Sequence, residues 1–119
     1  MPASIGLVLD CADPERLAPF WSAALGYANL GRAGSYVLLA PEDGGGPNLL
    51  LQRVPEPRVA KNRMHLDLHT PDIEAEASRL VELGARRLQP AVLEEHDTHW
   101  VLMADPEGNE FCVCDGGCC

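Results

Sequence analysis

Two histidines flank an aspartate in the segment RMHLDLHTPD, which spans residues 63–72. In an extended chain successive side chains alternate between faces, so His65, Asp67 and His69 point one way and the leucines between them point the other. Histidine and aspartate at this spacing are suited to metal ligation or to proton transfer. The same pattern also fits a solvated sheet face, so its chemistry depends on the elements around it.

Composition limits the classes of protein that fit this chain. Its 119 residues, 46% hydrophobic and 23% charged, predict one globular domain with a real core. The net charge of −9 disfavours nucleic acid, because phosphate binding depends on clustered lysine and arginine. The sequence contains no run of about 18 apolar residues, so it predicts no membrane-spanning helix. The segment MPASIGLVLDC lacks the basic start and long apolar block of a secretory signal, so we expect a cytoplasmic protein.

Cysteine accounts for five residues, Cys11, Cys112, Cys114, Cys118 and Cys119. In a cytoplasmic chain we expect reduced thiols rather than a disulfide framework. Cys112 and Cys114 share one face of a predicted strand and fit small buried side chains. The last four residues, Gly-Gly-Cys-Cys, are typical of a flexible tail.

The first half of the chain predicts a strand, a helix and three further strands. The strands cover residues 4–11, 27–30, 35–40 and 48–54. Asp13 and Pro14 are the capping and first residues that a helix prefers, and Gly26 ends the apolar stripe that follows. Pro19 falls inside this helix and predicts a kink or an irregular first turn.

The same order then repeats after a linker at 55–62. A strand at 63–69 and a helix at 72–83 precede strands at 86–89, 99–104 and 110–114. Asp13 and Asp72 are 59 positions apart, and so are Gly6 and His65. We therefore predict an α+β fold made of one module at 4–54 and another at 63–115, each packing its helix on one sheet face. The other faces would form a curved sheet enclosing a cup.

Three blocks of the sequence carry a family resemblance: LVLDCADPERLAPFWSAALGY, RVPEPRVAKNRMHLDLHTPDIEAEASRLVELGA and HWVLMADPEGNEFCVC. Together they resemble the vicinal oxygen chelate superfamily, and within it the glyoxalase-like proteins. That superfamily includes glyoxalase I, extradiol dioxygenases and bleomycin-binding resistance proteins. The resemblance implies two tandem βαβββ modules around a cup, a small-molecule ligand and a homodimer.

The resemblance also implies where a metal ion would be held. In the metal-dependent members, ligands come from the first and last strand of each module, and these positions fall on Gly6, Gln52, His65 and Cys112. His65 matches the usual histidine or glutamate, whereas Gly6 has no side chain and Gln52 is a weak oxygen donor. We therefore expect no bound metal.

Several functions follow from these positions. We expect a protein that binds a small organic ligand in its cup through Gln52, His69, Trp100, Glu110 and Cys112. One alternative is a metal-dependent lyase, isomerase or dioxygenase that holds zinc, nickel or iron at His65, Cys112 and Gln52, with help from Asp67 or His69. Another is a metal-free enzyme in which His65, oriented by Asp67, acts as general acid or base. Whether the protein is an enzyme stays open.

Overall fold

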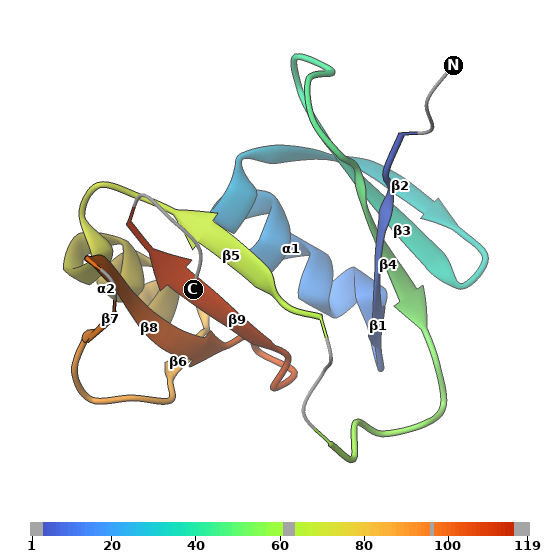
Figure 1. Cartoon of the computed structure of the whole chain (residues 1–119). Coiled ribbons are helices and arrows are strands. Elements are labelled where there is room, and N and C mark those ends of the chain that lie inside the picture. Colours follow the sequence, from blue (N-terminus) through green and yellow to red (C-terminus); the bar gives the residue numbers. More distant parts are fainter. Residues whose placement is uncertain (1–3, 61–63, 96, 116–119) are drawn as a thin grey trace. The chain divides into compact units, whose positions relative to one another are not determined.

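The structure is a computed structural model that describes residues 4–60, 64–95 and 97–115. The chain divides into two compact units, residues 1–58 and 59–119. Each unit combines a helix with a sheet, which confirms the predicted α+β class (Figure 1). Neither helix of the described ranges is long and apolar enough to cross a membrane.

The first unit contains β1 (Leu7–Cys11), α1 (Pro14–Leu25), β2 (Tyr27–Ala33), β3 (Tyr36–Pro41) and β4 (Leu49–Arg53). The strand order in its sheet is β1-β4-β3-β2, with β1 parallel to β4 and the other pairs antiparallel. The predicted order of strand, helix and three strands is therefore confirmed, although β2 extends three residues further than its pattern predicts.

Local capping chemistry explains where α1 begins and ends. The backbone N–H of Arg16 donates to Oδ1 of Asp13 at 3.2 Å, which satisfies one free donor of the first turn. Gly26 has φ +67°, the left-handed conformation that ends helices and that glycine adopts without strain. Pro19 does not end the helix, which continues to Leu25.

The core of the first unit lies between α1 and its sheet. The helix contacts β2, β3 and β4, and Leu17 and Trp21 are each only 1% exposed. Trp21 packs edge-on against Phe20, with ring centroids 5.1 Å apart. Trp21 is therefore a core residue, as its place on the apolar stripe predicts, and the sheet face opposite α1 is left open.

The second unit contains β5 (Leu66–His69), α2 (Ile73–Leu83), β6 (Arg86–Arg87), β7 (Leu93–Glu95), β8 (Thr98–Ala104) and β9 (Glu110–Cys114). Its strand order is β5-β9-β8-β6, and β7 pairs with β8. First and last strands are parallel, as in the first unit, so the predicted duplication is confirmed. The prediction of only three strands after α2 is wrong, because it omits β7. That strand has three residues, too few for alternation to show, and it forms by pairing with β8.

The helix α2 covers one face of the second sheet. Asp72 caps it by accepting a hydrogen bond from the backbone N–H of Ala75 at 3.1 Å, and the helix contacts β6, β8 and β9. Residues of β8 and β9 that alternate toward this core are each at most 1% exposed: Val101, Met103, Phe111 and Val113.

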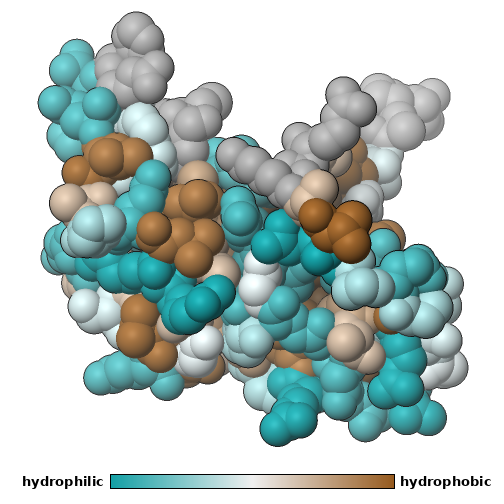
Figure 2. Space-filling view, turned by 90° about the horizontal axis from the view of Figure 1, so that it is seen from below, coloured by the Kyte–Doolittle hydropathy of each residue, from teal (hydrophilic) through white to brown (hydrophobic). Residues whose placement is uncertain are grey.

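Surface apolar residues lie singly or in small patches among polar ones, as the face in Figure 2 shows.

Three of the five cysteines lie in the core. Cys11, Cys112 and Cys114 are buried and form no disulfide within the described residues. Cys118 and Cys119 of the predicted tail lie outside the described residues, as do positions 61–63 at the end of the predicted linker and the start of the predicted strand.

A buried aspartate organises the turn between β8 and β9. Asp105 is 3% exposed, and its Oδ1 accepts hydrogen bonds from the backbone N–H groups of Glu107 and Asn109, both at 2.9 Å. The side-chain amide of Asn109 donates to Oδ2 at 2.9 Å, and Gly108 has φ +88°. The residues of Asp-Pro-Glu-Gly-Asn thus serve backbone geometry, which is the usual role of such residues in a turn.

A histidine bridges three strands at the other end of this sheet. The backbone N–H of His99 donates to Oδ1 of Asp115 at 2.8 Å, and its ring Nδ1 lies 2.9 Å from Oδ2. Its Nε2 lies 3.4 Å from a carboxylate oxygen of Glu94 in β7. Two hydrogen bonds from His99 lower the pKa of Asp115. The bond from the His99 backbone has the larger effect, and the bond from the ring has a smaller one.

The first prediction concerns the turn. Changing Asp105→Ala leaves two backbone N–H groups and the Asn109 amide without their acceptor, so we expect the free energy of unfolding to fall by about 2–4 kcal/mol. Urea unfolding followed by circular dichroism measures this. Asp43→Ala is the matched control, because Asp43 makes a similar contact to the N–H of Gly45 on the surface and its loss should cost under about 1 kcal/mol. Equal losses in the two variants would contradict the structural role of Asp105.

The second prediction is a pH dependence. Because folding lowers the pKa of Asp115, its carboxylate stabilises the fold above its unfolded pKa, and this contribution is lost as pH falls through the folded pKa. The melting temperature of Asp115→Asn should therefore lie below that of the unmodified chain at pH 7, with the gap closing toward acid. A gap that widens toward acid would have the wrong sign.

Candidate functional site

The face of the second sheet opposite α2, here called the open face, gathers most of the predicted site residues. Cys112 of β9 pairs with Asp67 of β5 on one side and with Leu102 of β8 on the other. Two residues along, Cys114 pairs with His69 and with Trp100. Paired residues point to the same side of a sheet, so all six share the open face.

Three of these side chains converge on one point. Nε2 of His65, just before β5, lies 3.2 Å from Oδ1 of Asp67. One donor atom each from His65, Asp67 and Cys112 lies within 4.8 Å of the others. The side chains of His65 and Asp67 are 34% and 24% exposed, and Cys112 is buried. We call this group the His–Asp–Cys cluster.

The second histidine of the segment takes a different partner. Nδ1 of His69 lies 3.8 Å from Sγ of Cys114, a residue that is fully buried. Of the two helpers considered for His65 and Cys112, the structure places Asp67 in the cluster and His69 in a separate pair with Cys114.

Trp100 and Glu110 have defined faces in the structure. Trp100 could face either side by its sequence, and its pairing with Cys114 places it on the open face, where it is half-buried. Glu110 begins β9 and alternates onto the same face as Cys112, also half-buried.

Gln52 belongs to the first unit, where it lies on the open face of the first sheet, opposite α1. Its Nε2 donates to the Tyr36 hydroxyl at 3.3 Å. These two residues line a shallow depression of about 470 Å³, together with Val8, Gly31, Ala33, Leu38 and Leu50. Most of these lining side chains are apolar. The surface is accessible to solvent, since Val8 is 57% and Tyr36 39% exposed.

The donor set of the His–Asp–Cys cluster fits a zinc-like ion. Imidazole nitrogen, carboxylate oxygen and thiolate sulfur are the three ligand types that zinc accepts, and three protein ligands leave a fourth position open. Tetrahedral bonds of about 2.0–2.3 Å put ligand atoms about 3.5 Å apart, so the present separations need only small side-chain movements. Gly6, at the position matching His65, is exposed and offers no ligand.

Two residues beside the predicted site were not predicted. Cys114 partners His69, and the alternation of Cys112 and Cys114 along β9 is the signal that could have indicated it. Tyr36 partners Gln52, and no local pattern indicates this, because the two residues meet only through the register of β3 on β4.

Comparison with known proteins agrees with this architecture. The family model described as "Glyoxalase-like domain" matches residues 6–114. No curated protein matches the chain in sequence.

Solved structures share its fold at low sequence identity. A glyoxalase-related enzyme from Fulvimarina pelagi has a TM-score of 0.74 and 20% identity, with 98% of this chain and 89% of that one covered. A glyoxalase/bleomycin resistance protein/dioxygenase family enzyme from Burkholderia phytofirmans PsJN has a TM-score of 0.75 and 13% identity, covering 92% and 94%. A glyoxalase/bleomycin resistance protein/dioxygenase from Nocardioides has a TM-score of 0.76 and 18% identity, covering 98% and 87%.

The family model spans nearly the whole chain, and the topology of each unit is that of the repeated module. The chain therefore belongs to the glyoxalase-like family of the vicinal oxygen chelate superfamily.

Proposed function

We propose that this glyoxalase-like protein binds a small organic ligand, and that the open face of the first sheet supplies the binding surface. The observation that carries the proposal is the depression at Gln52 and Tyr36. Its volume of about 470 Å³ lies within the range of about 300–1,000 Å³ common for ligand sites. An apolar surface with a few polar groups is also the usual composition of such sites.

The lining residues indicate what kind of ligand fits. The exposed ring of Tyr36 offers stacking area, and the side chains of Val8, Leu38 and Leu50 offer apolar contact. The Gln52 amide and the Tyr36 hydroxyl can fix the orientation of one polar group. A ligand with an aromatic or other flat apolar part and a hydroxyl or carbonyl therefore suits the depression. The net charge of −9 favours a neutral or cationic molecule.

Catalysis without a metal would use His65. Asp67, whose Oδ1 lies 3.2 Å from Nε2 of His65, can help to orient the imidazole for general acid–base chemistry at a carbonyl or epoxide. Four further residues on the open face of the second sheet are proposed ligand contacts: His69, Trp100, Glu110 and Cys112.

A second candidate function is metal-dependent chemistry at the His–Asp–Cys cluster. It is favoured by the convergence of three donor atoms in one unit, without any contribution from Gln52 or Gly6. A bound divalent ion would supply Lewis-acid polarisation of a substrate oxygen. His65, Asp67 and Cys112 would hold it, and His69 stays with Cys114.

The homodimer and the cytoplasmic location that the sequence predicts are also proposals for this protein.

The third prediction tests ligand binding at Tyr36. A thermal-shift screen of hydroxylated aromatics and basic glycopeptides should give hits whose affinity falls by about 10–100-fold in Tyr36→Ala, because stacking and apolar contact are lost. Val59→Ala is the control, since Val59 is 89% exposed and lies outside the depression. Hits that bind Tyr36→Ala as tightly as the unmodified chain would reject this surface. If the protein converts a hit to product and His65→Ala abolishes this conversion, the protein is an enzyme and not only a binding protein.

The fourth prediction separates the two candidate functions. If the cluster holds zinc, protein purified without chelator should contain about one equivalent by elemental analysis, and Cys112→Ser should bind it at least about tenfold more weakly. Cys114→Ser is the matched control, a buried thiol two residues along the same strand that pairs with His69. Well under one equivalent of any divalent ion, with no zinc uptake on titration, would reject the metal-dependent candidate.

A further inference from the structure

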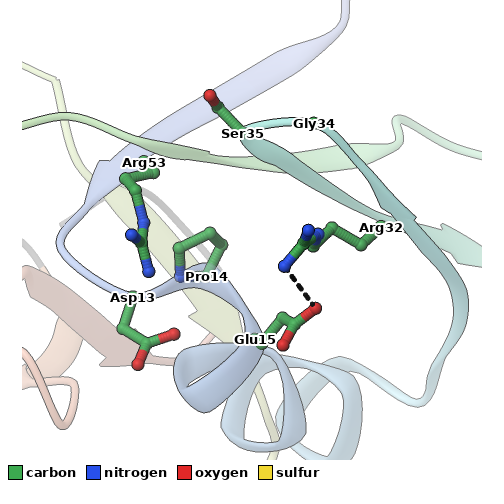
Figure 3. A pocket seen from close by; sticks show the side chains of 7 residues that line it. All are labelled: Asp13, Pro14, Glu15, Arg32, Gly34, Ser35 and Arg53. Carbon is green, nitrogen blue, oxygen red and sulfur yellow. Dashed lines mark hydrogen bonds and ion pairs between the residues drawn. The ribbon is translucent and has the colours of Figure 1, made fainter.

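A second cavity lies in the first unit, where α1 begins (Figure 3). It has a volume of about 210 Å³ and is lined by Asp13, Pro14, Glu15, Arg32, Gly34, Ser35 and Arg53. It is on the helix side of the sheet, so it is separate from the depression at Gln52 on the open face.

The sheet geometry directs both arginines to this place. Arg53 is the last residue of β4 and alternates onto the same face as the buried Leu51, which contacts the helix side of the core. Arg32 pairs across β2 and β3 with the buried Val37, so it points to the same side. In Figure 3 the two guanidinium groups extend toward the start of α1, on either side of Pro14.

The two cations differ in how they are engaged. Arg32 donates from Nη1 to Glu15 at 3.3 Å, and both side chains are 59% exposed, so this ion pair is weak and exchangeable. The guanidinium of Arg53 makes no hydrogen bond or ion pair with any residue in the described part of the chain. Its backbone N–H donates to the Ser35 carbonyl at 2.8 Å, which holds the end of β4 beside the β2–β3 turn.

We propose that this cavity, the Arg53 site, binds the carboxylate of a small organic acid. The planar guanidinium presents two parallel N–H donors that match the two oxygens of a carboxylate. Arg32 adds a second positive charge beside it. A volume of about 210 Å³ equals about seven water molecules, which suits a ligand of a few heavy atoms.

The carboxylates in the cavity select the charge of the anion. Asp13 and Glu15 balance Arg32 and Arg53, so every charge that an anion brings is added to a neutral set of groups. Because these four groups give no net attraction and the chain as a whole carries a charge of −9, a doubly charged phosphate is repelled more strongly than a singly charged carboxylate. The Arg53 site therefore favours a monocarboxylate.

The fifth prediction tests the Arg53 site on the full chain by amide NMR, with acetate and inorganic phosphate as probes at constant ionic strength. Acetate should shift the Ser35 and Arg53 amide signals saturably, and Arg53→Gln should weaken binding at least about tenfold, because charge-assisted hydrogen bonds are lost. Arg53→Lys keeps the charge without the paired donors and should also weaken it. Arg86→Gln, an exposed arginine of the second unit, is the charge-matched control and should bind as the unmodified chain does.

Several results would overturn the proposal. Shifts that never saturate, or equal weakening in Arg86→Gln, would mean general charge attraction. Phosphate binding more tightly than acetate would contradict the choice of a monocarboxylate. Tyr36→Ala should leave acetate binding unchanged, so the Arg53 site and the ligand surface at Gln52 can fail separately.

Discussion

The parallel pairing of the first and last strand in each unit is the constraint on which this structure depends. Parallel neighbours cannot be joined by a tight turn, so each module needs its crossover helix, and that helix must bury one face of the sheet. The pairing of β5 with β9 also brings residues more than forty positions apart into adjacent places. Asp67 meets Cys112 and His69 meets Cys114 for this reason.

The helix of each unit covers one face of its sheet, and the opposite faces of the two sheets differ in chemistry. The open face of the first sheet is mainly apolar, with Gln52 and Tyr36 as its polar groups. The open face of the second sheet carries titratable and thiol side chains. In our proposals the first face binds an apolar ligand, and the second face, considered by itself, carries groups suited to acid–base or metal chemistry.

The chain departs from the metal-binding pattern that its family resemblance implies. Gly6 offers no ligand, and Gln52 is bound to Tyr36 in the first unit. The His–Asp–Cys cluster assembles three donors inside the second unit alone. If this cluster held an ion, the sulfur of Cys112 would favour zinc over ions that prefer oxygen ligands.

The sequence by itself determined the features that depend on neighbouring residues. These are the capped helices, the Asp105 turn, the repeated element order, and His65 and Asp67 on one face, because capping and alternation act over a few positions. The tertiary structure decided the partners. Strand register is set by core packing over the whole sheet, so only the fold placed Asp67 rather than His69 beside His65 and Cys112, and paired His69 with Cys114. It also formed β7, which has too few residues to be recognised without β8.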